Sequence, residues 1–108
     1  MRQLAVYQNL RLAGILTEQH PGSGYLFAYD RDYLASGGNP ISVTLPPRRE
    51  PFEAEALFPF FEGLLPEGAN RRMVCRSRRI DENDVFGILS ALAGEDTIGS
   101  VSLKRMNE

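Results

Sequence analysis

The first half of the chain alternates apolar residues with polar or small ones, the pattern of strands that bury one face. Gln8 and Asn9 form a short turn between the first two runs, so these two strands should make a hairpin. Three strands are predicted from this pattern, at residues 4–7, 10–17 and 25–29.

A fourth strand is predicted at residues 41–45, where Ile41, Val43 and Leu45 fall on one face. The following Pro46-Pro47 pair ends it, because proline cannot donate to a strand ladder. Between the third and fourth strands, Asp30 can cap a single helical turn that carries Tyr33 and Leu34.

The second half changes to helical spacing of its apolar residues. Pro59 is tolerated only in a first turn and Pro66 disfavours helical angles at Leu65, so one helix should run from about residue 57 to 65. Pro66 would then open a second helix that reaches about Arg78. Residues 81–84 supply cap candidates for a third helix, which carries the apolar side chains Val85, Phe86, Ile88, Leu89 and Leu92 and ends at Gly94. Ile98, Val101 and Leu103 form a last extended run.

Strands and helices are thus segregated along the chain, which favours an α+β fold over a wound parallel sheet. We expect a small antiparallel sheet of about four to five strands packed with three short helices. The 108 residues suit a single domain, residues 1–108, because no linker divides them. A two-lobed kinase would need a longer chain.

Composition removes several classes of function. A single cysteine and a single histidine allow no internal disulfide and supply too few ligands for a zinc site, so no metal or other cofactor is expected. The net charge of −2 argues against a protein that coats nucleic acid. No apolar run approaches the roughly 20 residues that cross a bilayer, and no signal peptide opens the chain. A cytoplasmic protein without membrane contact is therefore the expectation.

Candidates for catalysis are few. His20 lies in a loop rich in proline and glycine, where a solvated side chain is the simpler interpretation. Cys75 is surrounded by arginines that would favour a thiolate, but a lone helical cysteine more often acts as a small buried apolar residue. Protein-kinase signatures are missing, and the only lysine is Lys104. The sequence indicates a protein that is not an enzyme.

Five of the twelve basic residues fall between residues 71 and 79. Such a cluster can bind phosphate or nucleic acid. However, acids flank it at Glu67 and at Asp81-Glu82, and no aromatic residue interleaves the arginines. A helix face that pairs with an acidic protein surface is the favoured interpretation.

Three motifs follow one another along the chain: residues 6–16 read VYQNLRLAGIL, residues 60–68 read FFEGLLPEG, and residues 86–99 read FGILSALAGEDTIG. These motifs resemble the small N-terminal subdomain of HipA-type serine/threonine kinase toxins. Their order and spacing follow the family pattern over nearly the whole chain. In that family the subdomain precedes a much longer catalytic portion, which this sequence lacks.

The resemblance implies a free-standing relative of that subdomain, such as the HipS-type antitoxin of three-gene HipBST systems. Such a protein would bind and neutralise a HipT-like kinase, while a separate HipB-like protein binds DNA. A structural or activating subunit, an excised N-terminal fragment of a HipA-like kinase, and a nucleic-acid-binding accessory protein stay open as alternatives. The chain has no tryptophan, so any plug into a kinase cleft would use phenylalanine, tyrosine, leucine or arginine. The candidate partner-binding residues are Phe60, Phe61, Glu62, Leu65, Arg71, Arg72 and Arg76.

Overall fold

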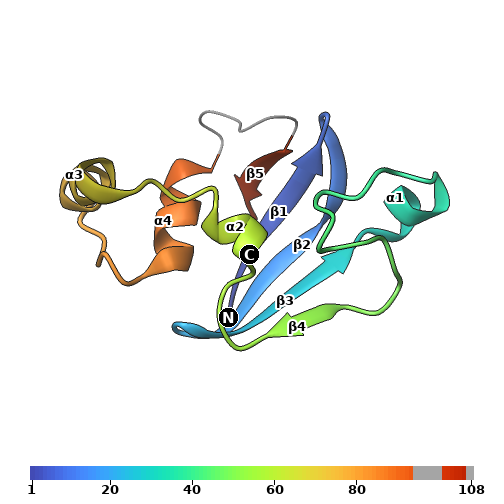
Figure 1. The fold of residues 1–108 in the computed structure, drawn as a ribbon, viewed down its shortest axis with the longest axis horizontal. Coiled ribbons are helices and arrows are strands. Elements are labelled where there is room, and N and C mark those ends of the chain that lie inside the picture. Colours follow the sequence, from blue (N-terminus) through green and yellow to red (C-terminus); the bar gives the residue numbers. More distant parts are fainter. Residues whose placement is uncertain (94–100, 107–108) are drawn as a thin grey trace.

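A five-stranded antiparallel sheet forms the centre of the molecule (Figure 1). The computed structural model describes residues 1–93 and 101–106. The strand order is β4-β3-β2-β1-β5, so the first strand lies inside the sheet and the last described strand forms one edge. The strands are β1 (Arg2–Gln8), β2 (Arg11–His20), β3 (Ser23–Tyr29), β4 (Phe52–Ala54) and β5 (Val101–Arg105).

Four helices accompany the sheet, which confirms the predicted α+β class. Asp30 caps α1 as predicted, because its Oδ2 accepts hydrogen bonds from the backbone N–H groups of Asp32 and Tyr33. Asp84 does the same for α4 through the N–H of Gly87. The helices are α1 (Arg31–Ala35), α2 (Pro59–Glu62), α3 (Gly68–Arg78) and α4 (Val85–Leu92). In the described part of the chain, no helix has the length and apolar character that a membrane crossing requires.

The prediction of a strand at residues 41–45 was wrong. This segment is a turn in which the N–H of Leu45 bonds to the carbonyl of Ser42 at 3.0 Å, and Val43 is 93% exposed. The hydroxyl of Tyr29 explains the difference: it accepts from the N–H of Ile41 at 3.1 Å and donates to the carbonyl of Leu45. A side chain thereby takes the backbone partners that a neighbouring strand would have supplied.

The sheet instead gains β4, a strand that the sequence pattern does not reveal because three residues carry no measurable period. The predicted helix at 57–65 is also shorter than expected. Only Pro59–Glu62 is helical, and the N–H groups of Leu64 and Leu65 bond three residues back. The prediction of a helix starting at Pro66 was two residues early, because Gly68, the first residue of α3, has a φ of +54°. The expected stop at Gly94 and the start of the last run at Ile98 lie outside the described residues.

The hydrophobic core lies between one face of the sheet and helices α2 and α4. Phe27 is its centre on the sheet: its ring lies 5.7 Å from that of Phe61 on α2, and both side chains have no exposed surface. Gly14 lies beneath the same ring, where an added Cβ would come within 2.8 Å of it. This contact requires glycine at that position. Other fully buried members are Leu4, Val6, Leu16, Phe86 and Ile88.

Candidate functional site

The predicted partner-binding residues around α2 divide between core and surface. Phe61 is fully buried and Leu65 is 8% exposed, so both contribute to the core that holds α2 on the sheet. Phe60 is half-buried, with its ring centre 5.2 Å from that of Phe61 in an edge-to-face contact, and Glu62 is exposed. Only Phe60 and Glu62 therefore offer surface that a partner can contact directly.

The predicted arginines lie on α3, a helix whose one buried side chain is Cys75. Arg71 is used internally, because its guanidinium donates to the backbone carbonyl of Glu82, with Nε at 3.1 Å. Arg72 and Arg76 are exposed and lie one turn apart on the same face. Between them and the following loop is a hollow of about 400 Å³, lined by Arg72, Cys75, Arg76, Ile80, Asp81, Glu82 and Asn83.

The structure does not bring the α2 and α3 residues together. Figure 1 shows α2 near the centre of the molecule, against the sheet, and α3 at one end of the long axis, joined to α2 by an extended segment. Met73 on α3 is 67% exposed, and neither the Arg72 nor the Arg76 guanidinium makes a hydrogen bond or ion pair within the described ranges. An unpaired pair of arginines beside an exposed methionine is a surface composition typical of protein interfaces. We refer to Arg72, Met73 and Arg76 as the α3 surface.

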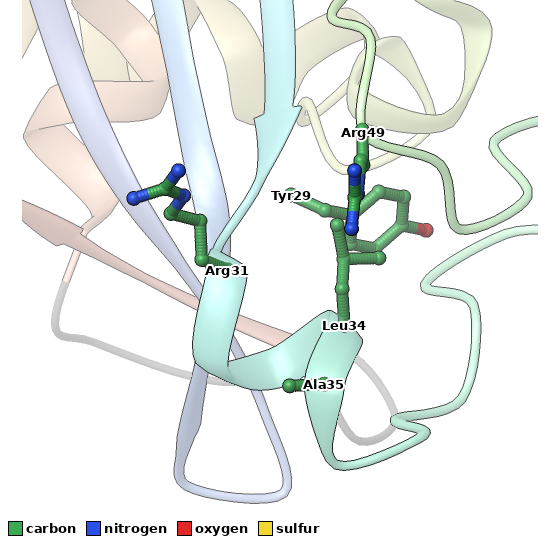
Figure 2. A pocket seen from close by; sticks show the side chains of 5 residues that line it. All are labelled: Tyr29, Arg31, Leu34, Ala35 and Arg49. Carbon is green, nitrogen blue, oxygen red and sulfur yellow. The ribbon is translucent and has the colours of Figure 1, made fainter.

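A second hollow, of about 500 Å³, lies at the opposite end of the molecule next to α1 (Figures 1 and 2). Sequence reasoning missed it, because its residues come from three separate segments. Figure 2 shows Arg31 and Arg49 on either side of the end of β3, with Leu34 and the ring of Tyr29 beside Arg49. The lining residues are Tyr29, Arg31, Leu34, Ala35 and Arg49, which we call the α1 hollow.

A charged network fixes β1, β2 and α4 to one another. Glu18 is 2% exposed, yet its carboxylate is satisfied: Arg2 donates from Nε at 2.8 Å and from Nη2 at 2.5 Å, and the Tyr25 hydroxyl donates at 2.9 Å. The same Arg2 guanidinium donates to Asp84 at 2.8 Å and lies 5.1 Å from the ring centre of Phe86. These contacts join side chains of separate elements, so the network stabilises the fold.

The electrostatics of this network follow from its contacts. Hydrogen bonds from Arg2 and from the N–H of Gly87 outweigh partial burial and lower the pKa of Asp84 below its ordinary 3.8. Burial, together with the hydrogen bond to Glu18, raises the pKa of Tyr25 to about 12. A sequence signal for the network does exist, because Arg2 and Glu18 occupy inward positions of strands that otherwise bury Leu4 and Leu16.

Acidification should therefore destabilise the protein partly through Asp84. A carboxyl whose pKa is lowered in the folded state adds stability above its ordinary pKa, and this stability is lost as the pH falls through the folded value. We expect the free energy of unfolding to fall more steeply between pH 7 and pH 2 for the wild type than for Asp84→Asn, which keeps a capping side chain. The difference should be about 1 kcal/mol or less, since Asp84 is 34% exposed. Parallel curves would contradict this role.

The remaining candidates do not form a catalytic arrangement in the part of the chain that the structure describes. His20 is exposed at the end of β2. Cys75 is 4% exposed, within the core cluster, which fits the interpretation as a small apolar residue. No group of three histidine, cysteine, aspartate or glutamate side chains among the described residues is placed to hold a metal ion. Glu95 and Asp96 of the third motif lie outside those residues.

Comparison with known proteins gives a consistent result. Residues 4–104 match the family described as the HipA N-terminal domain. An uncharacterized protein of Haemophilus influenzae is 37% identical over 91 residues, which are 84% of this chain and 80% of that protein. The putative kinase Y4mE of Sinorhizobium fredii is 34% identical over 104 residues, which are 95% of this chain but only 24% of the kinase.

The fold agrees with this sequence similarity. A solved structure of the N-terminal domain of HipA toxin superposes with a TM-score of 0.74 at 32% identity, covering 100% of this chain and 95% of that one. The chain therefore belongs to the HipA N-terminal domain family. This confirms the family resemblance that the three motifs indicated.

Proposed function

We propose that the chain is a cytoplasmic antitoxin of the HipS type, which binds a HipT-like serine/threonine kinase and neutralises it without catalysing a reaction. The observation that carries the proposal is the pair of relatives with different lengths. The same domain makes up most of the short Haemophilus protein but about a quarter of the putative kinase Y4mE. A domain that occurs both within a kinase-like chain and nearly alone is suited to dock on a kinase in trans.

The α3 surface is our first choice for the contact, with Phe60 and Glu62 as a second contact region. A stable protein interface buries about 1,200–2,000 Å² in total and uses a few arginine and large apolar side chains as anchors. Arg72 and Arg76 supply the arginines, and Met73 and Phe60 supply the apolar contacts. Arg71 contributes indirectly, because its bonds to Glu82 hold α3 against the loop that follows it.

Co-expression with a HipT-like kinase from the same genome tests the function. We expect the chain to co-purify with the kinase and to restore growth of cells that the kinase arrests. With purified proteins, increasing amounts of the chain should lower kinase autophosphorylation and substrate phosphorylation. A rise in kinase activity would instead identify an activating subunit, and an absence of binding would reject both roles.

Charge reversal on α3 locates the contact in the same assay. Arg72→Glu combined with Met73→Ala and Arg76→Glu should weaken kinase binding by at least about 100-fold, since anchor residues commonly contribute 2 kcal/mol or more each. Arg31→Glu with Arg49→Glu provides a charge-matched control at the other end of the molecule. Equal loss in both variants would show that overall charge, and not the α3 surface, drives binding.

A further inference from the structure

We infer that the α1 hollow is a binding site for an anionic group, a carboxylate or a phosphate, carried on an apolar body. This site is separate from the proposed kinase contact, because α1 and α3 lie at opposite ends of a molecule 41 Å long (Figure 1). The hollow of about 500 Å³ falls within the 300–1,000 Å³ range of small-ligand pockets.

The walls of the hollow are held by contacts inside the protein. The Tyr29 hydroxyl accepts a hydrogen bond from the N–H of Ile41 and donates one to the carbonyl of Leu45. The Tyr29 ring stacks on that of Tyr33, with 6.0 Å between the ring centres. Tyr33 in turn donates to the carbonyl of Asn39 at 2.5 Å. Because these contacts already fix the Tyr29 and Tyr33 side chains, ligand binding would cost little additional side-chain entropy at these two residues.

The segment that carries Arg49 is fixed in a similar way. The guanidinium of Arg48 lies 3.7 Å from the ring centre of Phe52 and donates to the carbonyls of Glu50 and Pro51. Arg48 is therefore committed to the start of β4, and its neighbour Arg49 projects beside Leu34 and Tyr29 instead (Figure 2). The contacts of Arg48 thus hold the backbone from which the Arg49 side chain reaches the hollow.

The two arginines of the hollow are available for a ligand. Arg31 and Arg49 are exposed, and neither guanidinium makes a hydrogen bond or ion pair within residues 1–93 and 101–106. Among the described residues, no acidic side chain lines the hollow, in contrast to the α3 hollow with Asp81 and Glu82. Asp30, Asp32 and Glu50 are adjacent to these arginines in the chain but do not line the hollow. Two unpaired guanidinium groups at the wall of such a hollow favour an oxyanion, which arginine binds through paired N–H donors.

The remaining lining residues define the rest of the ligand. Leu34, Ala35 and the Tyr29 ring are apolar, and the volume exceeds what a bare phosphate or carboxylate fills. The guanidinium of Arg31 points away from Arg49 in Figure 2, so it has to change rotamer to share the anion. The ligand chemistry is thus a charged head held by arginine and an apolar body that packs on Leu34. A free small molecule and the terminal or acidic residue of a peptide both have this chemistry.

Titrations of the full chain followed by two-dimensional NMR test the site with four probes. Phenyl phosphate has both the charged head and the apolar body, and N-acetylphenylalanine has both in the form of a peptide terminus. Inorganic phosphate has only the charged head, and benzyl alcohol has only the apolar body. We expect saturable shifts at residues of the α1 hollow for the first two, with dissociation constants of about 1 mM or tighter, as their size permits. Inorganic phosphate and benzyl alcohol should bind at least about tenfold more weakly. The tighter of the first two probes identifies the source, small molecule or peptide.

A matched pair of variants separates the site from general charge. Arg31→Gln with Arg49→Gln should weaken phenyl phosphate binding at least about tenfold, whereas Arg72→Gln with Arg76→Gln, which removes the same charge from α3, should leave it unchanged. The spectrum of each variant reports its folding directly. Equal weakening in both pairs, shifts spread over the whole surface, or no saturable shift with either two-part probe would overturn the assignment.

Discussion

Replacement of Phe61 by alanine is expected to lower the free energy of unfolding by about 3–5 kcal/mol. The Phe61 side chain has no exposed surface. Its ring centre lies 5.2 to 6.3 Å from the ring centres of Phe27, Phe58 and Phe60. Alanine would leave a cavity that the fixed strand β3 cannot close. A domain of this size has about 5–15 kcal/mol of total stability, so the variant should be close to unfolding. Chemical denaturation followed by circular dichroism measures the change.

Phe60→Ala is the control for this experiment, because the two residues are adjacent on α2 and Phe60 is only half-buried. It should cost no more than about half as much stability. If Phe61→Ala instead leaves stability unchanged and abolishes kinase binding, then Phe61 acts as an interface anchor and the described packing of α2 is not the one that operates in solution.

Replacement of Arg2 by methionine is expected to cost about 3 kcal/mol. The methionine keeps an apolar stem beside Phe86 but leaves the carboxylate of Glu18, which is 2% exposed, without its cation. Breaking a buried ion pair costs about 3–5 kcal/mol, and the lower end applies because the Arg2 side chain is 41% exposed. Thermal or chemical unfolding at pH 7 gives the value.

The double variant Arg2→Met with Glu18→Gln shows whether the cost arises from the unpaired charge. Glutamine fits the same space and needs no cation, so the double variant should recover at least about 1 kcal/mol relative to Arg2→Met. Additive losses in the two single variants would mean that Arg2 and Glu18 contribute independently, and that their contact is not what stabilises the sheet.

Local signals predicted most of the fold correctly. The β1–β2 hairpin, the Asp30 cap and α4 depend on neighbouring residues, and these elements were correctly placed to within a few residues. The turn at residues 41–45 depends on the hydroxyl of Tyr29, twelve or more residues away, and an alternating pattern cannot report such a contact. Likewise, β4 owes its existence to pairing with β3 and not to its own three residues.

The candidate site could likewise be predicted only in part from the sequence. The arginine cluster was predicted to form a helix face, and the structure places Arg72 and Arg76 together on the wall of one hollow. Their distance from Phe60 depends on the extended connection between α2 and α3, whose course the sequence does not specify (Figure 1). The α1 hollow combines Arg31 with Arg49 across a long loop, so only the folded chain could reveal it.

The position of β1 has a consequence for biosynthesis. Its outer edge pairs with β5, whose residues are synthesised long after those of β1, so Leu4 and Val6 stay without their partners Arg105 and Leu103 until then. At a translation rate of about 5–20 residues per second, this edge stays unpaired for roughly 5–20 s on each nascent chain. An unpaired strand edge readily recruits another strand. Newly made molecules should therefore depend on chaperone protection or early partner binding during that interval, although the finished sheet covers the same edge.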